Sequence, residues 1–231
     1  MTPKRRALLC SAQSELEQLI AKHLGSGNFH VDRLRQDSNG RPADLLADQP
    51  DLLILISEPE GASPAIEIIK AIRLAKDSIP IVHLIQDSHF GIRVESLKAG
   101  SDESLSFPFA LEELDARIEA LLRRSGMGVN HLDGAQISHG DLVLNTDTRE
   151  VTRRGVTEKL TVREYDLLTF FLQNPNQAIP RKTILHNIWG QTWTGDDNLL
   201  EVYIRYLRKK VERPGHDKLI QTVRGVGYML R

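Results

Sequence analysis

An unbroken apolar run between turn residues is the feature that most constrains this chain. Residues 52–56 are all leucine or isoleucine, Pro50 and Asp51 precede them, and Ser57 follows. A strand with one face in water alternates apolar and polar side chains, whereas a strand covered on both faces of a parallel sheet is apolar throughout. The run therefore predicts an inner strand of a parallel sheet. In such sheets functional groups gather just beyond the carboxyl ends of the strands.

The first half of the chain repeats this alternation of apolar strands and amphipathic helices. Besides the run at 52–56, we expect strands at 7–10, 29–34, 79–85 and 104–109. Segments with helical spacing of apolar residues separate them. Five such units predict an α/β fold, a doubly wound five-stranded parallel sheet of the flavodoxin-like type, over residues 1–124.

A change of composition separates this half from the next. Residues 125–136 are rich in glycine and polar residues, which is typical of a flexible linker. Beyond them, short strands give way to a helix that opens with a capping box, Thr161 and Glu164. Two more helices and a closing hairpin around Gly225 predict an α+β domain over residues 137–231.

The two halves differ in charge. Residues 138–231 contain 15 Lys and Arg against 11 Asp and Glu, a net charge of +4. Residues 1–137 contain 15 basic and 20 acidic residues, a net charge of −5. The basic character of the second half makes nucleic acid a candidate partner.

Composition also excludes several classes of protein. Cys10 is the only cysteine, which rules out disulfide frameworks and cysteine-based zinc sites. No apolar run approaches the length of a membrane span, and the first residues lack the long apolar core of a signal peptide. We therefore expect a cytoplasmic protein that needs no metal, cofactor or membrane.

The third helix of the second half has two contrasting faces. Leu200, Ile204, Leu207 and Val211 recur at the spacing of a core face. The opposite face carries mostly polar and charged side chains: Asn198, Glu201, Val202, Arg205, Arg208 and Lys209. Such side chains can read base edges in a major groove and neutralise nearby phosphates. An ordinary solvated helix face would have a similar composition, so the helix alone leaves both interpretations open.

Four segments of the second half resemble the winged helix-turn-helix effector domain of OmpR/PhoB-type response regulators: LTVREYDLL, IPRKTILHNIWG, LEVYIRYLRKKVE and TVRGVGY. The resemblance implies that Arg224 enters a minor groove and that the bases of double-stranded DNA are faced by Asn198, Glu201, Val202 and Arg205. It implies supporting or phosphate-contacting roles for Trp189, Tyr203, Arg208 and Thr222. The loop 190–197 is implied to touch RNA polymerase. The family often has Arg or Thr where this chain has Asn198 and Leu199, so the base preference is open.

The first half resembles the receiver domain of the same family through PDLLILI, IPIVHLI and GSDESLSFPFALEELDARIEALLRR. Receivers are phosphorylated on an aspartate after the third strand, and two Mg²⁺-binding acids, a hydroxyl and a lysine complete the site. The matching positions here hold Ser11, Ala12, Ile56 (or Ser57), Ile85 and Phe107, and the aromatic switch position holds Ser104. This set cannot hold a metal or a phosphoryl group. We therefore expect a receiver without aspartate phosphorylation, in which Ile56, Ile85 and Phe107 form an apolar plug.

The resemblance further implies a homodimer through the fourth helix, fifth strand and fifth helix of the receiver. Charged residues on these elements are Arg93, Asp102, Glu112, Arg117 and Arg124. Exposed ion pairs contribute little individually, so an apolar centre of Ile92, Leu97 and Leu111 is expected to help. The Phe107–Pro108 bond is expected to be cis.

Other interpretations stay open. A new site can arise from Ser57, Glu58, Glu60, Asp102 or Glu103. A hydrolase would pair Ser11 or Ser57 with a histidine, but no nucleophile motif surrounds His23, His30, His83 or His89. The leading hypothesis is a sequence-specific DNA-binding transcriptional regulator, not an enzyme, that acts as a dimer on repeated half-sites. The alternative is a signalling or scaffold protein whose receiver binds a regulatory protein partner.

Overall fold

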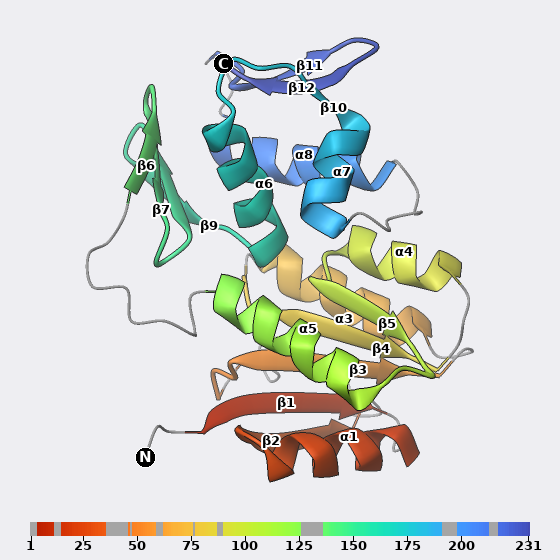
Figure 1. The fold of residues 1–231 in the computed structure, drawn as a ribbon. Coiled ribbons are helices and arrows are strands. Elements are labelled where there is room, and N and C mark those ends of the chain that lie inside the picture. Colours follow the sequence, from red (N-terminus) through yellow and green to blue (C-terminus); the bar gives the residue numbers. More distant parts are fainter. Residues whose placement is uncertain are drawn as a thin grey trace. The chain divides into compact units, whose positions relative to one another are not determined.

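The computed structural model describes residues 4–11, 15–35, 46, 48–58, 62–75, 77–86, 90–125, 136–190, 198–212 and 217–231 (Figure 1). The chain divides into two compact units, Met1–Met127 and Gly128–Arg231. Residues 126–135, most of the predicted linker, lie outside the described part. No helix among the described residues is long and apolar enough to cross a membrane.

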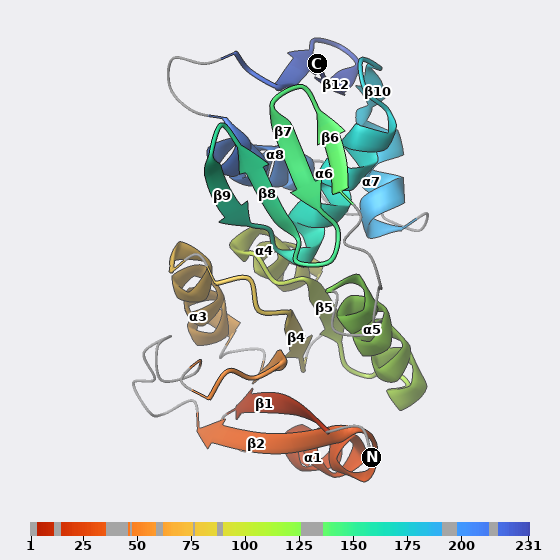
Figure 2. The same cartoon turned by 90° about the vertical axis from the view of Figure 1, so that its left-hand side faces the viewer.

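The first unit is a parallel sheet with helices on both faces. Its strands are β1 (Arg5–Ser11), β2 (Phe29–Arg35), β3 (Leu52–Ser57), β4 (Ile81–Ile85) and β5 (Glu103–Ser106). They lie in the order β2-β1-β3-β4-β5, and each neighbouring pair is parallel. The described helices are α1 (Glu15–Ser26), α3 (Ala62–Leu74), α4 (Phe90–Ala99) and α5 (Leu111–Arg124). Figures 1 and 2 together show α1 and α5 on one face and α3 and α4 on the other. The predicted doubly wound sheet is confirmed.

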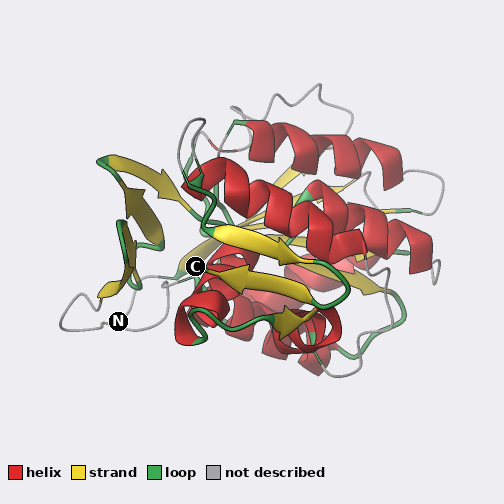
Figure 3. Cartoon of the chain, turned by 90° about the horizontal axis from the view of Figure 1, so that it is seen from above, coloured by secondary structure: helices red, strands yellow, loops and turns green. Residues whose placement is uncertain are grey.

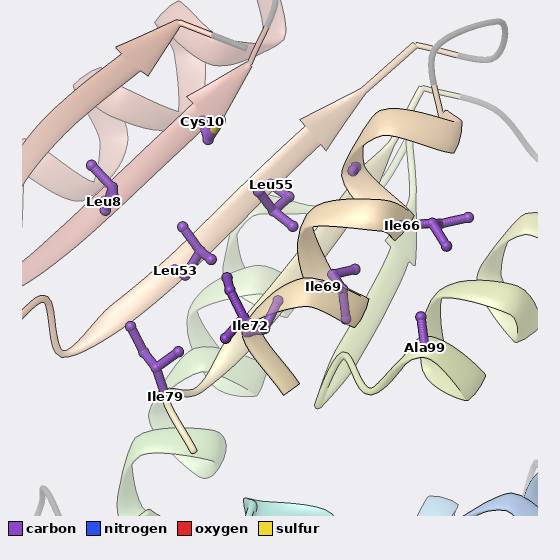
Figure 4. Close-up of a cluster of buried hydrophobic side chains, with 11 residues drawn as sticks. Leu8, Cys10, Leu53, Leu55, Ile66, Ile69, Ile72, Ile79 and Ala99 are labelled. Atoms are coloured by element: carbon purple, nitrogen blue, oxygen red, sulfur yellow. The ribbon is translucent and has the colours of Figure 1, made fainter. Parts of the chain in front are cut away.

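The core of this unit explains the apolar run. Every residue of β3 is buried, because helices cover both of its faces. On the α3 side, Leu53 and Leu55 pack among Ile66, Ile69 and Ile72 (Figure 4). Burying a side chain of this size contributes about 1.5–3 kcal/mol relative to leaving it exposed. The Phe107–Pro108 peptide bond is cis, as predicted.

The second unit combines two small sheets with three described helices. β6 (Gln136–His139), β7 (Leu142–Asn145), β8 (Glu150–Arg153) and β9 (Val156–Lys159) form an antiparallel sheet in chain order (Figure 2). The helices are α6 (Val162–Gln173), α7 (Arg181–Trp189) and α8 (Asn198–Val211). β10 (Ile179–Pro180) pairs with β12 (Gly227–Leu230), which pairs with β11 (Ile220–Val223). Figure 3 shows β11 and β12 as an antiparallel hairpin, the predicted wing.

The start of α6 is held by the predicted capping box. The Thr161 hydroxyl accepts from the backbone N–H of Glu164, and the Glu164 carboxylate accepts from the N–H of Thr161. Lys210 of α8 donates to the same carboxylate at 2.6 Å. The cap therefore also fastens α8 to α6, and caps of this kind contribute about 1 kcal/mol.

Two glycines shape the wing. Gly225 lies in the turn with φ +76°, a left-handed conformation that costs other residues energy. Gly227 has a different role, because a Cβ there would lie 2.1 Å from the carbonyl oxygen of Ile179. Only glycine lets β12 approach β10 this closely.

Candidate nucleic-acid interface and the receiver site

One face of α8 is buried in the second unit. The four residues predicted for its core face, Leu200, Ile204, Leu207 and Val211, are each at most 1% exposed. Leu199 and Tyr203 are buried as well, so the buried stripe is wider than predicted. This packing fixes the helix as a rigid support for its opposite face.

The opposite face presents charged side chains in a line. Glu201, Arg205 and Lys209 are exposed and spaced four residues apart, which places them one above another on the helix surface. Asn198, at the first position of α8, is also exposed, and Val202 is half-buried. Acceptors and long donors along one exposed face can contact base edges and phosphates.

Tyr203 does not belong to this surface. Its side chain is only 2% exposed, and its ring lies edge-on to Trp189 at 5.2 Å and to Tyr206 at 6.0 Å between ring centroids. Of the two roles predicted for Tyr203, support or phosphate contact, this burial fits support. Tyr203 packs the end of α7 against α8, and Trp189 is the half-buried partner.

Arg208 and Thr222 act together at the junction of α8 and the wing. The Arg208 guanidinium donates to the carbonyl of Ile220 at 2.7 and 3.1 Å and to the Thr222 hydroxyl at 3.0 Å. It also lies over the ring of Tyr228, 5.8 Å from the centroid. These contacts fit the supporting role predicted for Arg208. At the wing turn, Arg224 is exposed beside Gly225, where a thin hairpin can approach a groove.

One contact on this surface was not predicted from the sequence. Arg181, the first residue of α7, forms an ion pair of 2.8 Å with Glu201. Twenty positions separate the two residues, and only the packing of α7 against α8 brings them together. The rest of the predicted polymerase loop, after Gly190, lies outside the described residues.

In the first unit, the positions of the receiver's phosphorylation site meet at the carboxyl ends of the strands. Ser57 is the register partner of Ile85, and Ile85 is the partner of Ser106, directly before Phe107. Ile56 and Ile85 are 2% and 0% exposed, but Phe107 is 41% exposed. The three-residue apolar plug is therefore wrong for Phe107, whose ring contacts Phe109 edge-on instead. Ala12 lies outside the described residues.

A buried polar chain, which the sequence did not reveal, runs from β3 to α4. The Ser57 hydroxyl lies 2.7 Å from Nε2 of His83, and Nδ1 of His83 lies 2.8 Å from the Ser96 hydroxyl. The Ser96 hydroxyl lies 2.9 Å from that of Ser101. Neutral imidazole has one donor and one acceptor nitrogen, and serine hydroxyls can complement either. Burial lowers the pKa of His83 from 6.5 to about 4, which keeps the ring neutral near pH 7.

The hydrogen-bonded series Ser57–His83–Ser96 is connected like the nucleophile, base and orienting group of a catalytic triad. Ser57 is 2% exposed and His83 is 0% exposed, however, so neither meets solvent. A nucleophile must reach its substrate. The arrangement is accounted for by the need to satisfy buried polar groups, which are costly when unpaired.

At the end of β1, a carboxylate from helix α1, that of Glu17, lies beside Ser11. The Ser11 hydroxyl donates to Glu17 of α1 at 2.6 Å, and Arg33 of β2 lies 4.0 Å from the other carboxylate oxygen. Glu17 is 7% exposed. Burial, and then the charge of Glu17, raise the pKa of the neighbouring Cys10 thiol to about 11. Among the described residues, no three His, Cys, Asp or Glu side chains gather into a metal-binding group.

The acidic residues proposed for an alternative site do not come together among those that the structure describes. Asp102 and Glu103 stand at the amino end of β5, whereas Ser57 stands at the carboxyl end of β3, and the strands are parallel. Asp102 is 1% exposed, and one carboxylate oxygen accepts from Arg73 and from the backbone N–H of Ile81, both at 2.9 Å. Glu60 and His89 lie outside the described residues.

The same contacts correct the predicted dimer surface. Asp102 is bound inside its own unit, so it cannot form an intersubunit ion pair. Leu97, assigned to the apolar centre, is also buried, at 5% exposure. Arg117 and Arg124 both contact Glu103, at 3.5 and 3.2 Å. Two further predicted residues remain on this surface: Glu112 is exposed and Arg93 is half-buried, with a pKa lowered by burial and then by Arg117.

The second unit matches a known family of domains. The family described as "Transcriptional regulatory protein, C terminal" matches residues 155–230. Over 229 residues the chain is 39% identical to the response regulator MprA of Mycolicibacterium vanbaalenii, across 98% of this chain and 97% of the relative. It is 36% identical over 228 residues to YkoG of Bacillus subtilis, called a transcriptional regulatory protein, across 99% of both chains.

Among solved structures, a mutant of RitR matches 98% of this chain and 99% of its own with a TM-score of 0.66. At 24% identity, that likeness shows the fold. The relatives are transcriptional response regulators, which are not enzymes. The chain belongs to the OmpR/PhoB family of response regulators, transcriptional regulators that carry a C-terminal winged-helix DNA-binding domain.

Proposed function

We propose that the chain is a sequence-specific transcriptional regulator that acts without phosphorylation of its receiver. α8 lies in the major groove of double-stranded DNA, where Asn198, Glu201, Val202 and Arg205 face bases. Arg224 enters the adjacent minor groove. Lys209, Trp189 and the Arg208–Thr222 pair contact or support the phosphate backbone. The exposed line of Glu201, Arg205 and Lys209 on a helix packed from behind supports this arrangement.

The observation that carries phosphorylation independence is the set of residues at the strand ends. Ile56 replaces the phosphoryl-accepting aspartate and is buried. A hydrocarbon side chain has no lone pair to attack phosphorus, and Ser11, tied to Glu17, offers no pair of acids for Mg²⁺. Hydrogen bonds from Ser57 to His83 and from His83 to Ser96 hold α4 against the sheet, and they need no bound phosphoryl group or metal ion. The receiver accordingly stays in one state.

The receiver serves as a dimerisation module through α4, β5 and α5. The residues that carry this role are Arg93, Glu112, Arg117 and Arg124, and Asp102 is excluded from it. Arg117 binds Glu113 at 2.7 Å and reaches Glu103, so it sits within a charge network that a partner can extend. Arg117→Glu should shift the protein from dimer to monomer in sedimentation at roughly 10 µM. The matched control is Arg123→Glu, an exposed arginine of the same helix.

Other partners follow from the family. The loop 190–197 contacts RNA polymerase in the cytoplasm, and the receiver can bind a regulatory protein. The experiment that tests the function mixes untreated protein with duplexes carrying a randomised segment and sequences the bound fraction. Enrichment of a repeated half-site, unchanged by acetyl phosphate and Mg²⁺, is the expected result. Enrichment only after acetyl phosphate treatment would contradict phosphorylation independence.

A further inference from the structure

An ion pair crosses the surface assigned to DNA. Nη2 of Arg181 lies 2.8 Å from a carboxylate oxygen of Glu201. Arg181 starts α7, whereas Glu201 belongs to the exposed line of α8. The side chains are 32% and 46% exposed, so the pair is open to solvent and to a ligand.

Arg181 is anchored independently of this pair. Its backbone N–H donates to the Val226 carbonyl at 3.2 Å. Its guanidinium donates to the Tyr228 hydroxyl at 3.4 Å and lies 5.9 Å from the centroid of that ring. Tyr228 is 4% exposed, and the Arg208 guanidinium also lies over its ring, 5.8 Å from the centroid. A flexible surface pair contributes little because both side chains must be ordered, but here the base of the wing already orders the arginine.

The charge of Glu201 makes such an anchor consequential. A carboxylate that faces DNA is repelled by phosphates unless a donor compensates it. In the major groove, the amino group of cytosine is the donor that a Glu side chain accepts from. An unrestrained Glu side chain would lose rotamer freedom on making that contact. A carboxylate held by a cation makes the contact with less repulsion and less loss of entropy.

We propose that Arg181 positions the Glu201 carboxylate for a cytosine amino group and thereby sets the base preference at one position of the DNA site. Arg181 itself acts through Glu201 rather than by touching a base. This inference rests on the proposed function, because it requires α8 to lie in the major groove.

The test compares the wild-type protein with five variants by selection from duplexes that carry a randomised segment. The variants are Arg181→Ala, Arg181→Lys, Glu201→Gln, the Arg181→Ala/Glu201→Gln double variant, and Lys182→Ala as control. Lys182 is the exposed cation next to Arg181, so its loss removes the same charge without removing the ion pair. Arg181→Lys is included because it keeps the cation if the alanine variant is poorly folded. Affinities for the enriched duplex and its single-base substitutions are then measured.

Arg181→Ala should reduce the preference for cytosine at one position on the order of tenfold. Glu201→Gln should lose the preference at that same position, and the double variant should show no further loss. Arg181→Lys should give an intermediate preference, and Lys182→Ala should leave the motif unchanged. An Arg181→Ala protein that binds every sequence more weakly but keeps the wild-type motif would overturn the inference. A wild-type protein that enriches no motif would overturn the proposed function, and with it this inference.

Discussion

The strand ends of the first unit and the α8 surface of the second treat polar groups in opposite ways. In the first unit, Ser57 and His83 are buried and satisfy each other. In the second, Glu201 and Arg205 are exposed on a helix whose other face is fixed in the core. Polar groups that are buried and mutually satisfied stabilise one conformation. Polar groups that are exposed and held from behind are available to a ligand.

The largest expected effect is a loss of stability that is confined to the second unit. Gly227→Ala places a Cβ 2.1 Å from the Ile179 carbonyl oxygen and should destabilise the second unit on the order of 3 kcal/mol. The first unit should keep its stability. Hydrogen exchange on peptides from each unit measures both effects in one sample. Gly225→Ala is the control, because its Cβ meets open space and only the positive φ costs roughly 1 kcal/mol. Equal losses for the two variants would refute the role given to the β10–β12 approach.

Acid should weaken the first unit before the second. The pKa of His83 is lowered from 6.5 to about 4 by burial, so the folded unit binds fewer protons than the unfolded chain between these values. The stability that the neutral ring contributes is therefore fully present above pH 6.5 and is lost as the pH falls through 4, by roughly 3 kcal/mol.

Asp141 provides the contrasting case in the second unit. Hydrogen bonds from Arg153, and then from Arg154, lower its pKa from 3.8 to about 2, so its contribution is lost only as the pH falls from 3.8 through 2. The free energy of unfolding of the first unit should not show the loss between pH 6.5 and 4 in the His83→Gln variant. An unchanged pH profile in that variant would remove His83 from the account.

On the DNA surface, Arg205→Ala should have a larger effect than loss of any other exposed arginine of the second unit. Arg205 can contact a base edge while α8 stays packed, and a bidentate contact contributes about 1–3 kcal/mol of discrimination. Binding isotherms on the selected duplex and on a scrambled one measure the loss. Arg154→Ala removes an exposed arginine at the β8–β9 turn and should leave discrimination intact. Thermal unfolding should barely change in Arg205→Ala, because Arg205 is exposed.

Arg224→Ala should give the smallest effect of this series and a different kind of effect. Arg224 is exposed at the wing turn, so its contribution is mainly electrostatic. Binding should weaken evenly on specific and scrambled DNA. The slope of log K against log salt concentration should decrease in magnitude by about 1, which corresponds to the loss of one phosphate contact. A selective loss on the specific site would assign base reading to the wing.

Much of the fold could be predicted because its signals are local. The apolar run of β3, the Thr161–Glu164 capping box and the core face of α8 each lie within one element. The burial of Tyr203 could not be predicted from helical spacing, which leaves it at the edge of the core stripe, because its ring contact with Trp189 joins α8 to α7.

Side-chain contacts between distant elements could not be predicted. The pairing of Ser57 with His83 depends on the register of β3 and β4, and that of His83 with Ser96 depends on how α4 packs. The burial of Asp102 by Arg73 likewise joins residues 29 positions apart. The prediction of a receiver without aspartate phosphorylation, by contrast, depends only on residue identities such as those of Ile56 and Ile85, and it stays a prediction until phosphorylation is measured.

The most direct test of the proposed phosphorylation independence is the intact mass of the protein after incubation with acetyl phosphate and Mg²⁺. A response regulator with its aspartate in place serves as the positive control under the same conditions. In our proposal Ile56 takes the phosphoryl-accepting position, and Ser57 is buried against His83. We therefore expect the mass to stay unchanged while the control gains a phosphoryl group. A stable phosphoryl adduct located in residues 4–125 would contradict it.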